Sequence, residues 1–164
     1  MDLVVRRDGT AVWGETMFRC ALGRTGIARD KREGDGTTPL GRFPMRRLLY
    51  RQDRIALPRT LLSVQALDPK AGWCDDPADK HYNQKVTLPY PASAEQLWRE
   101  DALYDLIVPL GYNDAPVVAG NGSAIFLHIA KPDYGPTEGC VALALNDLIQ
   151  VLGQADELSC VEVV

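Results

Sequence analysis

The chain has 164 residues, enough for one domain with a hydrophobic core, and we expect a single domain over residues 1–164. Hydrophobic residues make up 46% and charged residues 24%, as in ordinary globular proteins, and the net charge of −4 gives no indication of nucleic-acid binding. No apolar run approaches the roughly 20 residues that a membrane-spanning helix needs, so we predict no integral membrane segment.

The N-terminal part of the chain is typical of a β-hairpin. Residues 3–6 predict a first strand, Asp8-Gly9 a turn, and residues 11–22 a second strand. Residues 23–40 are rich in Gly, Asp, Thr and Pro, which indicates a long functional loop. Further strands are expected where β-branched and aliphatic residues are frequent, at 42–50, 61–67, 103–110, 124–130 and 158–164.

Two segments have helical signals. Residues 93–96 read Ser-Ala-Glu-Gln, a capping box that predicts a helix running to residue 99. Asn146 is expected to cap a second helix over 147–152, which Gly153 would end. Because strands outnumber helices, we predict a mainly β fold, a single-domain β-sandwich or barrel with one or two short helices at its edge.

Two stretches between the predicted strands, 72–83 and 111–122, look irregular and polar. In the first of them, Trp73, Tyr82 and Asn83 combine aromatic surface with hydrogen-bonding groups, which suits the wall of a substrate groove. An exposed loop pinned by Trp73 fits the same composition equally well.

The four cysteines are Cys20, Cys74, Cys140 and Cys160. No pair has the C-x-x-C spacing of a structural zinc site, and pairing them with the two histidines matches no ligand pattern, so we predict no metal site. Cys20 and Cys160 lie in apolar, strand-like stretches and are expected in the core. Nothing in the sequence supports a disulfide between them.

The strongest functional signal is the pair His128 and Cys140, separated by eleven residues. A cysteine attacks as its thiolate, and a nearby imidazole can remove the thiol proton and later return a proton to the leaving amine. Gly139 permits a tight turn, in which the amides of Gly139 and Cys140 would stabilise an oxyanion. Taken singly, each residue is also typical of a core position, the histidine as a satisfied core residue and the cysteine as a small hydrophobe.

Two neighbours of this pair carry expectations of their own. No Asp or Asn is identifiable as the group that orients the imidazole, and a backbone carbonyl of Gly135 or Thr137 is a candidate for that role. Glu138 is expected to point away from Cys140, because a carboxylate beside a thiolate is repulsive.

The histidine on a strand, the loop and the sequence Thr137-Glu138-Gly139-Cys140-Val141 together resemble the signature of the L,D-transpeptidase (YkuD-type) catalytic domains of bacterial cell-wall enzymes. The upstream run over 37–43, Thr-Thr-Pro-Leu-Gly-Arg-Phe, is similar to the Thr-Pro-x-Gly-x-Phe element of that family. The resemblance therefore covers nearly the whole chain. It implies a β-sandwich with Cys140 as nucleophile in a groove and His128 as general base and acid.

By the same resemblance, the protein would be a peptidoglycan L,D-transpeptidase that crosslinks stem peptides through a thioacyl-enzyme, giving 3,3 or 1,3 links. Its partners would be those stem peptides and carbapenem-type inhibitors, with no cofactor. With water as the acceptor it would instead be an L,D-carboxypeptidase or endopeptidase, and without activity a wall-binding module. A papain-like protease is disfavoured, because there the cysteine precedes the histidine.

This chain departs from the commoner family pattern at two places, where Glu138 and Ala142 stand for a histidine and an arginine. In the family the arginine is thought to bind a substrate carboxylate. Residues 24–59 hold ten Lys or Arg against four Asp or Glu, so Arg24, Lys31 or Arg32 would supply the missing charge.

The substrate-binding residues that we predict are accordingly Lys31, Arg32, Trp73, Tyr82, Asn83 and Thr137. The implied activity requires contact with peptidoglycan, hence a place in the periplasm or cell envelope. The first seven residues are nevertheless too short and too soon charged to read as a signal peptide.

Overall fold

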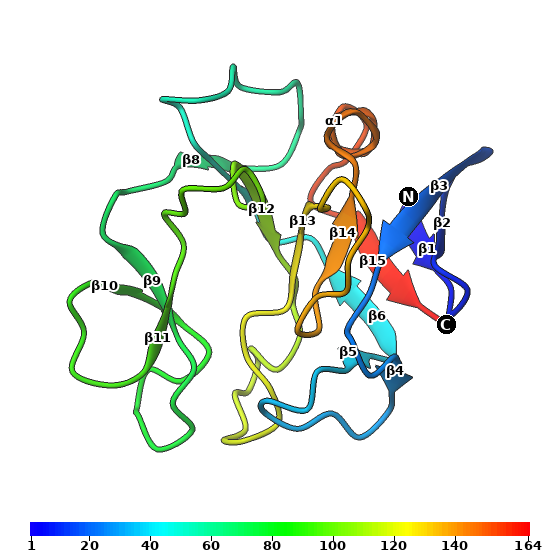
Figure 1. Ribbon diagram of the computed structural model, residues 1–164. Coiled ribbons are helices and arrows are strands. Elements are labelled where there is room, and N and C mark those ends of the chain that lie inside the picture. The colour runs from blue at the N-terminus through cyan, green and yellow to red at the C-terminus, as the bar shows by residue number, and fades with distance from the viewer.

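A large curled sheet dominates the computed structural model, which describes residues 1–164 (Figure 1). With one helix and many short strands, the chain is mainly β, as predicted. No helix in it has the length and apolar character needed to cross a lipid bilayer.

The large sheet has ten strands in the order β6-β15-β1-β2-β3-β14-β13-β12-β7-β8. Its strands are β1 (Asp2–Val5), β2 (Thr10–Trp13), β3 (Thr16–Ala21), β6 (Gly41–Pro44), β7 (Leu48–Tyr50), β8 (Val64–Ala66), β12 (Leu106–Pro109), β13 (Phe126–Ile129), β14 (Val141–Leu143) and β15 (Cys160–Val163).

Two of the predicted strands are in fact broken. The stretch 11–22 contains both β2 and β3, because Gly14 adopts a left-handed φ of 59° and turns the chain so that Trp13 pairs with Thr16. The stretch 42–50 divides into β6 and β7. An isolated bridge between Met45 and Leu110 lies at this break and joins the chain after β6 to the residue that follows β12. The bridge brings strands far apart in the sheet order together around one core.

Strand periodicity decides which side chains of β13 meet the main core. Ile125, Leu127 and Ile129 belong to the main cluster of 24 buried hydrophobic residues, whereas Phe126 belongs to a second cluster of nine. His128 lies two residues from Phe126 and so projects from the same face. The neighbouring strand follows the same rule, since Val141 and Leu143 face the main core and Cys140 belongs to the second cluster. Both candidate catalytic side chains therefore project on the side away from the main core.

A smaller sheet of three strands, in the order β10-β9-β11, stands beside the large one (Figure 1). Its strands are β9 (Ala71–Cys74), β10 (Lys85–Thr87) and β11 (Ala94–Gln96). The predicted helix over 93–99 is therefore wrong. Ala94 to Gln96 pair with β9 instead, and Leu97 is fully buried in the second cluster, so tertiary pairing outweighs the capping signal. The expectation of irregular structure over 72–83 is wrong in part for the same reason.

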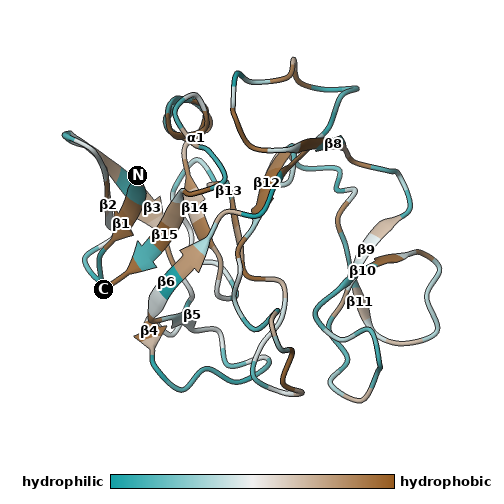
Figure 2. Ribbon diagram, turned by 180° about the vertical axis from the view of Figure 1, so that it is seen from behind, coloured by the Kyte–Doolittle hydropathy of each residue, from teal (hydrophilic) through white to brown (hydrophobic).

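The loop predicted over 23–40 contains a short parallel pair, β4 (Ile27–Ala28) with β5 (Thr38–Pro39). The rest of it is turns and irregular chain, and 111–122 holds no strand. In Figure 2, β12 and the neighbouring part of the sheet are coloured hydrophobic, whereas many of the connecting loops are hydrophilic.

The one helix, α1 (Leu145–Leu152), has eight residues and buries Leu148, Val151 and Leu152. It begins at Leu145, so Asn146 lies within its first turn and does not cap it, while Gly153 ends it as predicted. All four cysteines are free and buried, which places Cys20 and Cys160 in the core without a disulfide.

Candidate active site

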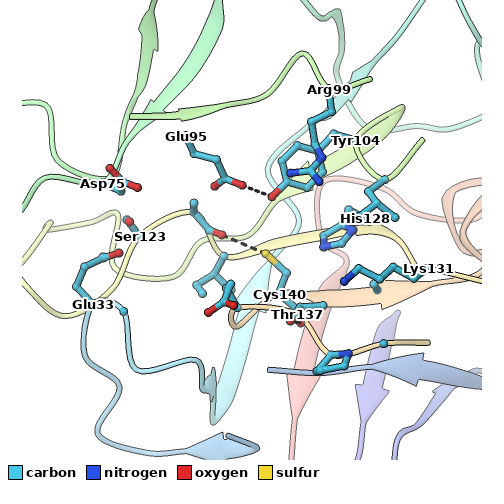
Figure 3. Close-up of a pocket in the computed structure, with 18 of the residues that line it drawn as sticks. Glu33, Asp75, Glu95, Arg99, Tyr104, Ser123, His128, Lys131, Thr137 and Cys140 are labelled. Carbon is cyan, nitrogen blue, oxygen red and sulfur yellow. Dashed lines mark hydrogen bonds between the residues drawn. The ribbon is translucent and has the colours of Figure 1, made fainter. Parts of the chain in front are cut away.

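A cleft of about 400 Å³ lies between the large sheet and the loop before β12, and both His128 and Cys140 line it (Figure 3). The elements that contribute to it come from many parts of the chain. Its lining residues are Lys31, Glu33, Gly34, Asp75, Glu95, Arg99, Leu103, Tyr104, Ser123, Ala124, Ile125, His128, Lys131, Gly135, Pro136, Thr137, Glu138, Cys140 and Ala142.

The turn that carries Cys140 is built by Thr137 and Gly139. The Thr137 hydroxyl donates to the carbonyl oxygen of Cys140 at 2.7 Å and accepts the Gly139 N–H at 3.1 Å. Gly139 has φ of 141°, and a Cβ on it would lie 2.7 Å from the carbonyl oxygen of Thr37. Only glycine fits such a position. The amide of Cys140 itself, directly after this turn, donates no backbone hydrogen bond.

The sulfur of Cys140 is held between two backbone groups that lie just before and at the start of the neighbouring strand β13. Its S–H donates to the carbonyl oxygen of Ala124 at 3.2 Å, and the N–H of Phe126 donates to the sulfur at 3.4 Å. Burial raises the pKa of the thiol to about 12, and the negative charge of Glu95 adds to this effect. The Phe126 amide and the charge of Lys31 act in the opposite direction. The resting cysteine is therefore a protonated thiol.

The imidazole of His128 is buried, and its Nδ1 lies 2.8 Å from the carbonyl oxygen of Ile129. A carbonyl only accepts, so Nδ1 carries the proton and Nε2 keeps its lone pair. Burial lowers the pKa of this imidazole to about 4. The group that orients the ring is therefore the carbonyl of Ile129, in place of the candidates Gly135 and Thr137.

Tyr104 fixes the other side of the imidazole. Its ring stands edge-on to His128, with the ring centres 5.1 Å apart, and also packs against Phe126. The Tyr104 hydroxyl donates to the carboxylate of Glu95, which overhangs the cleft (Figure 3). Burial raises the pKa of that carboxylate.

The three aromatic and amide residues predicted as a groove wall lie behind the cleft and do not line it. Asn83 Oδ1 accepts from the Ala124 N–H at 3.0 Å and from Trp73 Nε1 at 2.9 Å, while its amide donates to two carbonyls of 112–113. The Tyr82 hydroxyl accepts the Gly122 N–H and donates to Glu33. They clamp the segment 122–124, whose carbonyl at Ala124 receives the Cys140 thiol.

The basic residues of the upstream loop are divided between two places. Lys31 lines the cleft, is only 5% exposed and pairs with Asp35 at 2.9 Å, with its Nζ close to Gly139. Arg32 is exposed and lies outside the cleft lining. Arg24 pairs with Glu138 at 3.0 Å, so the Glu138 carboxylate is turned toward that guanidinium and solvent.

Of the predicted site residues, His128, Cys140, Lys31 and Thr137 line the cleft. Gly139 precedes Cys140, and its N–H, predicted as an oxyanion donor, is already bonded to Thr137. Sequence reasoning missed Glu95, Arg99, Tyr104, Ser123 and Lys131, which also line the cleft. Lys131 follows His128 by three positions, and Ser123 precedes the same strand, so their closeness to His128 in the sequence could have indicated a place in the site. Nothing in the sequence indicates that Glu95 and Tyr104 belong to it. No group of three or more His, Cys, Asp or Glu side chains is arranged to hold a metal ion.

Comparison with known proteins gives one family. A family model described as the L,D-transpeptidase catalytic domain (YkuD) matches residues 2–163. No curated protein matches the chain. Among solved structures, the chain is similar to the helical cell shape determining protein Pgp2 from Campylobacter jejuni, with a TM-score of 0.40 and 16% sequence identity. That match covers 99% of this chain and 46% of Pgp2, so the chain spans less than half the length of that protein.

Proposed function

Because the chain belongs to the L,D-transpeptidase (YkuD) catalytic domain family, we propose that it is a cysteine acyltransferase acting on the stem peptides of peptidoglycan. The observation that carries this proposal is the pair His128 and Cys140 on one cleft, with the Nδ1 proton of His128 donated to the carbonyl of Ile129. A nucleophile, a base and a group that holds the base are the minimum for acyl transfer.

The first step is acylation of Cys140. His128 takes the thiol proton as the sulfur attacks the carbonyl carbon of the donor peptide, so that a thiolate forms only with substrate present. A resting neutral pair fits the raised pKa of Cys140 and the lowered pKa of His128. The free amide of Cys140 is suited to receive the oxyanion, because the Gly139 N–H is already bonded to Thr137.

Collapse of the tetrahedral intermediate breaks the C–N bond of the donor. His128 returns its proton to the departing amine, which leaves a thioester on Cys140. An amine of a second stem peptide then attacks the thioester and gives the crosslink. Water in its place gives hydrolysis, which would make the protein an L,D-carboxypeptidase or endopeptidase.

A substrate carboxylate needs a positive partner, and Lys131 is suited to this role. It lines the cleft, is exposed and forms no ion pair within the chain, and in Figure 3 its side chain reaches below His128. Arg99 lies nearby but is already bonded to Asp101 by two hydrogen bonds. Lys131 therefore takes the place that the family assigns to the arginine for which Ala142 stands here.

A protein with this activity would act in the cell envelope, where its substrate lies. Incubation with purified sacculi, followed by muropeptide separation and mass measurement, tests the proposal. Transferase activity gives new 3,3 or 1,3 crosslinks, and hydrolysis gives shortened stems. Unchanged muropeptides with the native chain, or identical changes with Cys140→Ala, would reject a role for Cys140 in catalysis.

A further inference from the structure

The cleft has an acidic wall, which we define as Glu33, Asp75 and Glu95 together with Ser123. All four line the cleft, and in Figure 3 Glu33, Asp75 and Ser123 lie on the side of Cys140 opposite to His128. The carboxylates come from three distant segments, and the charges of Glu33 and Asp75 both act on Glu95. The fold thus collects negative charge at one end of the site.

None of these three carboxylates forms an ion pair with a cation of the chain, and Arg99 acts on Glu95 only through its charge. Every ion pair of the protein involves other acidic residues. Glu33 and Glu95 each accept a hydrogen bond from a tyrosine hydroxyl, which leaves their charge in place. Like charges gathered in a part-buried cleft repel one another unless a positive group binds between them.

Two polar atoms of the wall also have no partner. The Asp75 Oδ1 atom and the Ser123 hydroxyl are buried and make no hydrogen bond. The Ser123 side chain is 8% exposed, and its hydroxyl contacts that of Tyr82, which already donates to Glu33 and accepts the Gly122 N–H. Buried polar atoms without partners are uncommon in folded proteins, and here both belong to the wall of the cleft. They are acceptors available to a ligand that brings its own N–H donors.

The opposite end of the cleft has the opposite sign. Lys131, which forms no ion pair, lies on the His128 side with the Asp101-paired Arg99, and Cys140 lies between the two ends (Figure 3). A substrate that carries both an amine and a carboxylate would therefore bind in one direction only.

The geometry points to a binding site for a primary ammonium group at the acidic wall, where Asp75, Glu33, Glu95 and Ser123 hold the amine of the acceptor stem peptide before it attacks the Cys140 thioester. This inference rests on the proposed function. An ammonium carries three N–H donors, and the wall offers several acceptors at once. A neutral or acylated amine would lack both the charge and the full set of donors.

The three N–H protons of the ammonium go to three different places during transfer. The ammonium gives one proton to a wall carboxylate, and Glu95 is suited to accept it because burial raises its pKa. The neutral nitrogen attacks the thioester carbon, so that a C–N bond forms and the C–S bond breaks. A second N–H proton passes through His128 to the sulfur, which restores the thiol, and the third remains on the new amide.

The first test measures binding in the Cys140→Ala background, where no reaction occurs. The probes are a stem tetrapeptide with a free side-chain amine and the same peptide with that amine acetylated, titrated by calorimetry. We expect Asp75→Asn to weaken binding of the free-amine peptide about tenfold, the loss of one charge-assisted contact, and to leave the acetylated peptide unchanged. Ser123→Ala should weaken the same peptide by a smaller factor.

Glu157→Gln is the matched control, because Glu157 is exposed and lies outside the cleft. It removes the same charge from the protein and should leave the affinities for the free-amine and the acetylated peptide unchanged. Equal affinity for the two peptides, or an equal loss for both in Asp75→Asn, would overturn the inference. Unfolding curves of each variant check that the fold is retained.

A second test separates this inference from the proposed function. An amine-acetylated donor is used to form the thioester, and a free-amine peptide is then added to the native chain and to Asp75→Asn. We expect the variant to form the thioester normally and to divert it from crosslinking toward hydrolysis. Thioester formation with undiminished crosslinking in the variant would overturn the ammonium site alone. A native chain that forms no thioester would overturn the proposed function.

Discussion

The Nδ1 atom of His128 lies 2.8 Å from the carbonyl oxygen of Ile129, the next residue in the chain. The contact fixes the tautomer without any acidic partner, because a peptide carbonyl can only accept the proton. In a carboxylate-paired histidine the partner stabilises the imidazolium. Here the partner is neutral and the ring is buried, so the protonated state is disfavoured until substrate chemistry requires it.

From this arrangement we predict that His128 makes its own contribution to the pH dependence of the free energy of unfolding. Above pH 6.5 the imidazole is neutral in both the folded and the unfolded chain and contributes nothing. As the pH falls from 6.5 toward about 4, the unfolded chain takes up a proton that the folded chain does not. The free energy of unfolding should therefore fall by about 3 kcal/mol over this window and then level off.

Urea unfolding at several pH values checks this prediction when the native chain is compared with His128→Asn. The difference between the two curves removes the contribution of the carboxylates, which also lose stability in acid. A constant difference across the window would contradict the account. Imidazole NMR, with His128→Asn used to assign the signals, should show the Nδ1–H form and titration near pH 4.

Gly139→Ala should destabilise the protein and abolish acyl transfer. A Cβ there meets the Thr37 carbonyl oxygen at 2.7 Å, and the left-handed φ of 141° adds strain. We expect a loss of about 3 kcal/mol or more in the free energy of unfolding. Gly120→Ala is the matched control, because Gly120 has φ of 82° with nothing within 4 Å of its Cβ position, and it should lose only about 1 kcal/mol. Equal losses would show that contact with Thr37 does not matter.

Thr137 is expected to act by holding the turn, through the two hydrogen bonds of its hydroxyl to Gly139 and Cys140. Thr137→Val keeps the shape and removes both bonds, so stability should fall by about 1 to 3 kcal/mol and acylation of Cys140 should slow. Thr137→Ser keeps the hydroxyl and should retain most of the stability and most of the acylation rate. Rapid-quench mass measurement of acylation is the check, and a Thr137→Val variant as fast as the native chain would refute the positioning role.

Lys31 is expected to tune the reactivity of Cys140, because its ammonium lies beside Gly139 and lowers the thiol pKa. Lys31→Met should slow alkylation of Cys140 by iodoacetamide at fixed pH, by up to about tenfold. Peptide mapping separates Cys140 from the three buried cysteines elsewhere. Arg32→Met is the control from outside the cleft and should leave the rate unchanged. An unchanged rate in Lys31→Met would remove Lys31 from the site.

Much of the fold could be predicted because short strands of β-branched and aliphatic residues have a clear pattern. The central strands over 106–109 and 126–129 lie inside the predicted stretches 103–110 and 124–130, since they are buried on both faces and form apolar runs. The strand over 94–96 was not, because its three residues carry a helix-start signal that only pairing with β9 overrides. The local sequence gives no indication of that pairing.

The residues of the candidate site also differ in whether the local sequence could predict them. His128, Gly139 and Cys140 share one short stretch of sequence, so their spacing alone suggested the chemistry. The other side of the cleft comes from Glu95 and Tyr104, whose hydrogen bond exists only after the three-stranded sheet has packed beside β12. Asn83 shows the converse, because its composition suggested substrate contact and its amide is used fully inside the protein.

The most direct test of the central claim is the mass of the intact protein after brief exposure to a stem-peptide donor. We expect an increase equal to the acyl part of the donor, carried by the peptide that contains Cys140 and released by hydroxylamine as a thioester. His128→Asn should form the adduct far more slowly, and Cys140→Ala should not form it. An adduct that persists in Cys140→Ala, or none in the native chain while its folded state is intact, would contradict the assignment of Cys140 as the nucleophile.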